Sequence, residues 1–179
     1  MRVGMFPLLI SGLLATPGLA AAQTLARTQG EPAPPASGFA AAVTLVGDDI
    51  LVSRTGAELR LATYPQPGGV YVFRRDESGD WSVAEVLSPL GGTGETGDQF
   101  GASIAGSGDR LVIGAPGTNE ANGVAYVFER GERSGDTWVQ SAMVSTDGAP
   151  RAGLGSAVAV VGDVAFVGAP GGLGDLPRF

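Results

Sequence analysis

The sequence contains no histidine, no cysteine and no lysine, and these absences exclude most common catalytic chemistry. Without His and Cys there is no Ser-His-Asp triad, no thiol nucleophile and no His- or Cys-bound zinc. Without Lys there is no Schiff base and no phosphate-loop lysine. A carboxylate-pair glycosidase stays formally open. We nevertheless expect no enzyme activity, no catalytic residue and no cofactor.

Positive charge is also scarce, and long apolar runs are absent. The chain has 11 basic and 18 acidic residues, a formal net charge of −7, with no basic cluster. A protein that binds a phosphate backbone needs such a cluster, so we expect no nucleic-acid partner. The longest apolar stretch, residues 3–14, is too short to cross a bilayer, so no membrane span is expected.

The N-terminus is typical of a cleavable signal peptide. Met1-Arg2 is a short positive start, residues 3–14 are apolar, and Ala20-Ala21-Ala22 offers a small-residue cleavage site. We predict a signal peptide over residues 1–22, cleavage after Ala22, and a secreted, periplasmic or cell-surface location. A hydrophobic first strand is the alternative. Residues 23–38, rich in Pro, Ala and polar side chains, predict a flexible linker.

Two later stretches are near copies of each other. Residues 100–116 and 154–170 both begin with an apolar residue, place a Gly-Asp pair eight residues later, and end in Gly-Ala-Pro. A more degenerate copy starts at Phe39, with Gly47-Asp48 at the same offset. Self-similarity at this period indicates a modular array of small supersecondary units.

Each full unit contains signals for four strands. In the second unit they are residues 102–106, 110–113, 124–128 and 138–144. The first unit has matching signals at residues 70–73 and Trp81. Strands such as Leu111-Val112-Ile113 are apolar at consecutive positions, which is typical of sheets buried on both faces. The expected fold is therefore all-β, a partial β-propeller of four-stranded antiparallel blades, with a β-sandwich as the alternative.

The repeats define the expected domain organisation. We predict an incomplete propeller over residues 39–179, with blades at 39–89 and 100–145 and a partial blade at 154–179. Propellers close with roughly four to eight blades, and closure protects the terminal strands. About two and a half blades fall short of that number. We therefore expect self-association through unpaired blade edges.

These residues resemble a known repeat family. Phe100-Gly101, the Gly-Asp turn and Gly114-Ala115-Pro116 are similar to the FG-GAP repeat of integrin α-subunit heads and of many secreted bacterial proteins. Residues 97–138 resemble its bacterial subtype well, residues 153–170 as a half copy, and residues 39–81 only loosely. The resemblance implies a secreted or cell-surface module of the binding or adhesion type, whose ligand is an unknown protein or glycan.

The metal site of integrin-type blades is not expected in this chain. That site needs a D-x-D-x-D-G loop, because clustered oxygens bind Ca²⁺. The corresponding loops hold one carboxylate each, Asp109 and Asp163, and Asp48-Asp49 lacks the spacing. Asp48, Asp109 and Asp163 recur once per repeat and are interpreted as turn formers. We therefore expect calcium to leave the melting temperature unchanged.

One loop remains as a candidate binding site. Residues 118–122 carry Asn119, Glu120 and Asn122, whose side chains could contact a cation or a sugar; a plain solvated hairpin loop is the alternative. Four aromatic residues could form a sugar-stacking platform, but their matching places in the two repeats favour blade-packing core: Tyr71, Trp81, Tyr126 and Trp138.

Three functions stay open at this point. The first is the binding module described above, as one part of a longer propeller protein. The second is an extracellular carbohydrate-active enzyme that uses carboxylates such as Glu95 and Glu120. The third is a truncated gene product with no function of its own.

Overall fold

The computed structural model describes residues 38–55, 68–90, 96–131, 136–146 and 151–171. All of these described residues belong to one compact unit, residues 36–179. The predicted signal peptide and nearly all of the predicted linker lie outside the described residues, as does Glu95.

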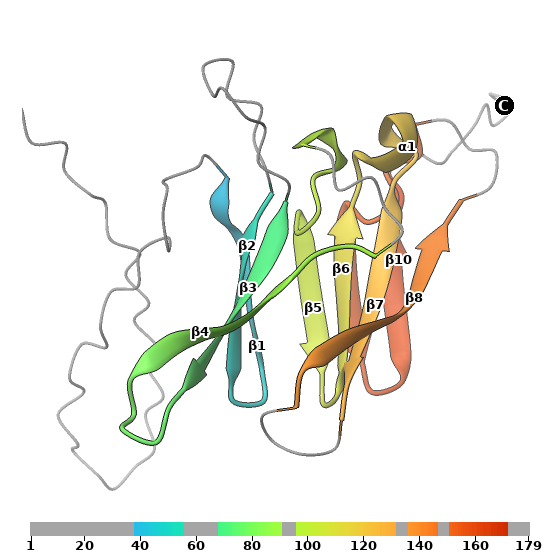
Figure 1. The fold of residues 1–179 in the computed structure, drawn as a ribbon. Coiled ribbons are helices and arrows are strands. Elements are labelled where there is room, and N and C mark those ends of the chain that lie inside the picture. The colour runs from blue at the N-terminus through green and yellow to red at the C-terminus, as the bar shows by residue number, and fades with distance from the viewer. Residues whose placement is uncertain (1–37, 56–67, 91–95, 132–135, 147–150, 172–179) are drawn as a thin grey trace, which may run out of the picture. The chain divides into compact units, whose positions relative to one another are not determined.

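The described chain is all-β, as predicted, and consists of three antiparallel sheets (Figure 1). The first sheet contains β1 (Phe39–Val46), β2 (Asp49–Arg54), β3 (Gly69–Arg75) and β4 (Trp81–Leu87). The second contains β5 (Ser103–Ser107), β6 (Arg110–Ala115), β7 (Val124–Arg130) and β8 (Trp138–Ser145). The third contains β9 (Ala157–Val161) and β10 (Val164–Gly168). In each sheet, consecutive strands are neighbours, which is the expected meander.

The Gly-Asp pairs form the first hairpin turn of every repeat. Gly47, Gly108 and Gly162 have φ values of 60°, 63° and 55°, a left-handed conformation that glycine adopts without steric cost. The register follows from these turns, because Val46 pairs with Asp49 and Ser107 pairs with Arg110. The prediction that these pairs form turns is confirmed.

The outer halves of the two complete sheets also match. In both, the ladder between the third and fourth strands is interrupted at the same place, between Val72 and Phe73 and between Val127 and Phe128. A bulge of this kind adds a residue to one strand and increases the local twist. The two sheets are therefore repeats in their irregularities as well as in their strands.

One predicted strand end was wrong. We expected the second strand of the second repeat to stop at Ile113, but β6 continues through Gly114 and Ala115. These two residues pair with Ala125 and Val124 of β7. The strand ends only before Pro116, whose nitrogen has no hydrogen to donate.

The main core lies between the first two sheets. Phe100 is buried there, with its ring 5.5 Å from that of Tyr126 and 6.3 Å from that of Phe128. Tyr126 and Trp138 belong to this core, as predicted, whereas Tyr71 and Trp81 are half-buried.

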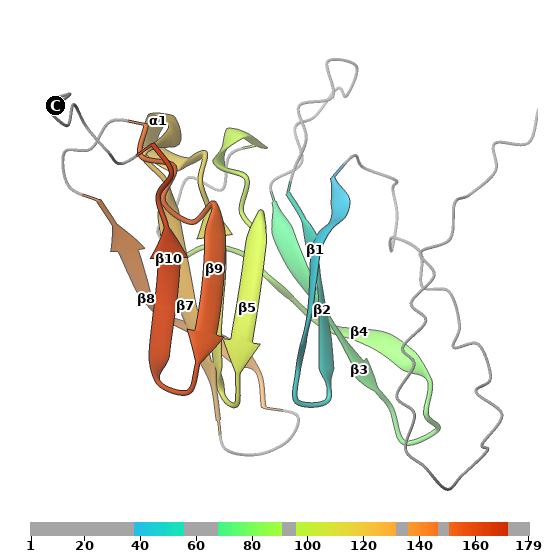
Figure 2. The same ribbon diagram turned by 180° about the vertical axis from the view of Figure 1, so that it is seen from behind.

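The three sheets pack in chain order, the first against the second and the second against the third, which favours successive blades over a single two-sheet sandwich. β1 packs beside β5, and β5 packs beside β9 (Figure 2). β6 also packs against β9. Successive repeats thus bring their first strands together, and each sheet covers the next. This is the arrangement of partial propeller blades, and the described sheets form an open series.

Candidate functional site

The predicted binding loop forms a short helical turn, α1 (Thr118–Ala121), between β6 and β7. Asn119, Glu120 and Ala121 have φ values of 53°, 58° and 69°. Left-handed backbone costs roughly 1–2 kcal/mol for each residue other than glycine. The segment joins the antiparallel strands β6 and β7 with exposed residues, as a solvated hairpin loop does, and its backbone forms a left-handed turn.

Hydrogen bonds from both sides hold this turn in place. The Gly117 N–H donates to the carbonyl oxygen of Asp98, 3.1 Å away, in the 3₁₀ turn η1 (Thr96–Asp98). On the other side, the N–H groups of Gly153 and Leu154 donate to the carbonyl oxygens of Ala121 and Asn122 at 2.9 and 3.0 Å. The turn is therefore held on one side by the segment that precedes β5 in the second repeat, and on the other side by the third repeat.

Glycine is required where the turn meets the third repeat. Gly123 has a φ of 83° and forms a bridge with Leu154. A Cβ atom at Gly123 would overlap the backbone of Leu154 and Gly153. The close backbone approach explains why the Asn-Gly pair stands here, although it does not form a two-residue hairpin turn.

The three predicted site residues divide into two kinds. Asn119 and Glu120 are exposed on the turn. Asn122 is half-buried, and its Oδ1 accepts a hydrogen bond from the Arg151 N–H at 2.8 Å. Asn122 therefore joins two repeats, and the exposed polar surface of the turn comes from its two neighbours.

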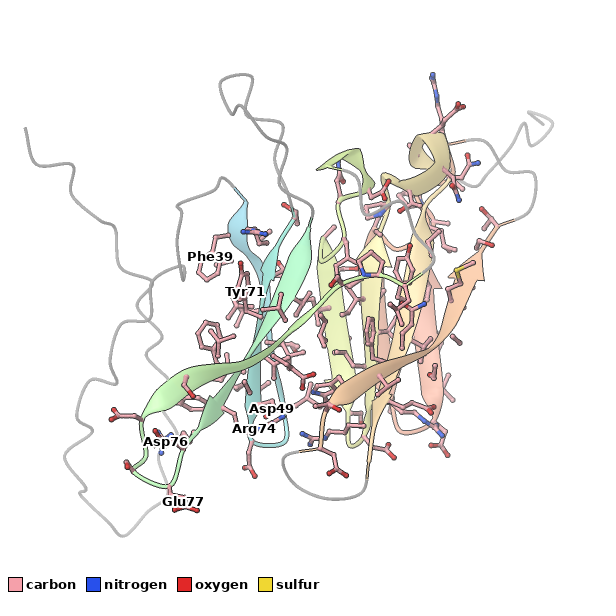
Figure 3. The ribbon with its side chains drawn as sticks, in the orientation of Figure 1. Phe39, Asp49, Tyr71, Arg74, Asp76 and Glu77 are labelled. Carbon is pink, nitrogen blue, oxygen red and sulfur yellow. The ribbon has the colours of Figure 1, made fainter. Side chains whose placement is uncertain are left out.

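A second polar cluster, which the sequence did not reveal, surrounds Asp49 at the start of β2. The carboxylate is fully buried. Arg74 of β3 donates to both of its oxygens, from Nε to Oδ1 at 2.7 Å and from Nη2 to Oδ2 at 2.9 Å (Figure 3). From the second sheet, Arg130 Nη1 and Trp138 Nε1 donate to Oδ2 at 2.9 and 3.2 Å. Asp49 therefore ties two repeats together.

The electrostatics of the cluster favour the ionised carboxylate. Burial alone would raise the pKa of Asp49, but hydrogen bonds from Arg74 and Trp138 and the charges of Arg74 and Arg130 lower it below 3.8. The hydrogen bond to Asp49 raises the pKa of Arg74. Burial raises the pKa of the neighbouring Glu85 above 4.5, although Glu85 accepts from the Trp138 N–H.

Sequence reasoning missed this cluster because its members are far apart in the chain. Asp49 is 25 residues from Arg74 and 89 from Trp138. One signal was present in the sequence. In both complete repeats, an Arg precedes the hairpin between the third and fourth strands and a Trp follows it. In the structure they stack, with Arg75 5.0 Å from the Trp81 ring centroid and Arg130 4.9 Å from that of Trp138.

The chemistry of the two sites differs. The Asp49 carboxylate is closed to solvent and its oxygens already accept four hydrogen bonds, so it serves the fold. The α1 turn instead presents an amide and a carboxylate to solvent. Over the described ranges, no three Asp or Glu side chains gather closely enough to hold a metal ion. No helix in the same part of the chain has the length and apolar character needed to cross a membrane.

Comparison with known proteins follows the repeat pattern. Residues 81–128 match the family model of the FG-GAP repeat. The chain carries an FG-GAP repeat. The match begins at Trp81 on β4 and ends at Phe128 on β7, so the sequence repeat runs from the last strand of one sheet to the third strand of the next. A search of curated proteins found no match to the chain.

Proposed function

We propose that this chain is a secreted or cell-surface binding module of the adhesion type, with no catalysis of its own. Its ligand is a protein or a glycan, and the contact surface is the α1 turn. The observation that carries the proposal is the exposure of Asn119 and Glu120 on a turn that backbone bonds fix from two sides. The FG-GAP repeat supports it, as a module of adhesion-type propellers.

The fixed turn suits recognition for a physical reason. A loop that is ordered before binding loses less conformational entropy when a ligand arrives. Loops on a rigid β scaffold are also where binding residues concentrate. The Asn119 amide can both donate and accept, and the Glu120 carboxylate accepts from hydroxyl or amide groups. These groups match the donors and acceptors of sugars and of peptide surfaces.

The absence of catalysis is proposed from the groups that the chain offers. His, Cys and Lys are absent from the whole sequence. Asp49, a carboxylate whose pKa is lowered, is fully buried and accepts hydrogen bonds from Arg and Trp donors. Such a group has neither access to substrate nor a proton to exchange.

A binding screen tests the function. The full chain is applied to glycan and protein arrays, and each hit is titrated with an Asn119→Ala/Glu120→Ala variant. We expect the variant to lose at least about tenfold in affinity, equivalent to about 1.4 kcal/mol. The matched control is Glu77→Ala, an exposed acid on the β3–β4 hairpin at the other end of the strands (Figure 3). Equal loss in both variants, or no hit on either array, contradicts the proposal.

The proposed location has a separate test. Cleavage after Ala22 leaves Gln23 as the first residue, either free or cyclised. Mass spectrometry of the exported protein should find this terminus. An exported pool that retains Met1 contradicts the proposed signal peptide.

A further inference from the structure

The third repeat presents an exposed apolar face. Val161, Val164 and Phe166 on β9 and β10 are 70%, 54% and 62% exposed. Val161 pairs with Val164 beside the Gly162-Asp163 turn, and Phe166 lies two residues further along β10. These three residues define what we name the acceptor face. Clustered apolar side chains of this size on a sheet mark an interaction surface.

The first repeat shows what covers such a face. By register from the Gly-Asp turn, Val161 corresponds to Val46 and Phe166 corresponds to Leu51. Val46 and Leu51 are 2% and 0% exposed, because the second sheet packs against them in the main core. The structure therefore contains a template in which an acceptor-type face is covered by the next blade.

The first sheet carries, on β1, the kind of surface that covers such a face. On β1, Val43 and Leu45 are 45% and 70% exposed and define the donor face. Their counterparts in the second repeat are Ile104, which packs against the main core, and Gly106, which lies against Val46.

An aromatic pair continues the likeness on the same sheet. Phe39 and Tyr71 meet edge to face at 5.8 Å, as Phe100 and Tyr126 do at 5.5 Å (Figure 3). The donor face thus has the aromatic geometry with which the second repeat covers the first.

We propose that the acceptor face binds the donor face of a second copy of this chain, head to tail, and repeats between molecules the packing of the first two sheets. Within the described residues, each copy presents one acceptor face and one donor face. The contact is therefore heterologous, and it adds copies one after another unless the ring closes. Apolar burial on both faces drives the association. The α1 turn is not involved, so this inference is independent of the proposed ligand binding.

Two side chains make this contact looser than its internal template. Leu45 stands where the second repeat has Gly106, whose Cβ would already meet the Val46 side chain. Val164 takes the position that Asp49 has in the first repeat, where the Asp49 carboxylate accepts a hydrogen bond from Arg130. In the contact between copies, the counterpart of Arg130 is Arg75 of the second copy, and Val164 offers it no carboxylate. The association is therefore weaker than the internal junction, and repairing either position should tighten it.

A complementation experiment tests the proposal. Phe166→Asp inactivates the acceptor face and Leu45→Asp inactivates the donor face, and both positions are exposed, so the sheets themselves are preserved. In sedimentation velocity, the full chain should form a concentration-dependent series of oligomers. Each variant alone should be monomeric, and an equimolar mixture should form dimers only. Circular dichroism and thermal melts of each variant verify the fold.

Gain of affinity provides the second measurement. Val164→Asp should tighten association by at least about tenfold, and adding Arg75→Ala should remove that gain. Association that persists in both face variants indicates pairing of strand edges instead and overturns the proposal. A wild-type chain that stays monomeric at all concentrations, or a mixture that fails to form dimers, overturns it as well.

Discussion

The two junctions between repeats share one close contact, Gly101 against Ser53 at the first and Gly155 against Gly114 at the second, but differ in their buried charge. Between the first and second sheets, a fully buried carboxylate on β2 receives donors from the next sheet. Between the second and third sheets, the backbones themselves approach: Gly155 lies against Gly114, and Ser103 Oγ donates to the Gly155 carbonyl oxygen at 2.7 Å. At the second junction Arg110 takes the position of Asp49, so the close glycine contact recurs there and the buried carboxylate does not.

The charged pairs at equivalent positions show what the difference means. In the first repeat Asp49 pairs with Arg74, and in the second Arg110 pairs with Glu129, so the charges are reversed. The Asp49 side chain is fully buried, whereas those of Arg110 and Glu129 are 39% and 50% exposed. Water screens an exposed pair, and a buried one depends wholly on its partners. The same register thus yields a structural anchor in one repeat and a surface pair in the other.

Removing the buried carboxylate should have the largest effect. Asp49→Ala removes the buried carboxylate to which the guanidinium groups of Arg74 and Arg130 both donate. Loss of one partner from a buried ion pair costs roughly 3–5 kcal/mol. Chemical denaturation should show a fall of this size in the free energy of unfolding. A fall below about 1 kcal/mol would mean that the cluster contributes no more than a surface pair.

Disturbing the backbone junction should have the next largest effect. Gly123→Ala combines an unfavourable φ with overlap against Leu154, and should cost on the order of 3 kcal/mol. The matched control is Gly108→Ala, where φ is also positive but no atom lies within 4 Å of the added Cβ. The control should cost about 1–2 kcal/mol. Equal losses in urea titrations would show that conformation, and not close approach, selects glycine at this junction.

Lowering the pH should weaken the first junction selectively. The pKa of Asp49 is lower in the folded chain than its ordinary value of 3.8, so its stabilisation is present above 3.8 and is lost as the pH falls through the folded value. Glu85 has a pKa raised above 4.5, and its contribution is present below 4.5 and lost as the pH rises through the folded value.

The Asp49→Asn variant separates these contributions. The difference in unfolding free energy between wild type and Asp49→Asn should narrow as the pH falls below 3.8. A difference that stays constant across this range would show that the folded chain does not depress the pKa of Asp49.

The smallest effect is expected at the exposed ion pair of the second junction. Arg110 Nη1 lies 2.6 Å from Asp163 Oδ1, but the Asp163 side chain is 91% exposed. Asp163→Ala should change the free energy of unfolding by no more than about 1 kcal/mol, because solvent and salt screen the pair. Thermal melts of the variant and the wild type at low and high salt measure this change in stability. A loss as large as that of Asp49→Ala would contradict the expectation that the exposed pair contributes less than the buried one.

The sequence by itself determined the repeat, the meander within each sheet and the Gly-Asp turns. These features are local, since glycine supplies the positive φ at Gly47, Gly108 and Gly162, and runs of apolar residues specify strands buried on both faces. It also placed Tyr126 and Trp138 in the core, but its prediction of the same environment for their counterparts Tyr71 and Trp81 was wrong, since both are half-buried.

Only the tertiary structure decided which polar residues meet. The carboxylate of Asp49 finds Arg130 and Trp138 because the second sheet packs on the first, a contact that no local pattern encodes. The left-handed turn at Asn119 and Glu120 has the same cause, since hydrogen bonds from the third repeat offset a conformation that the turn's own residues disfavour. Local conformational preference determines the strands of each blade, and packing between blades determines the Asp49 cluster and the conformation of the α1 turn.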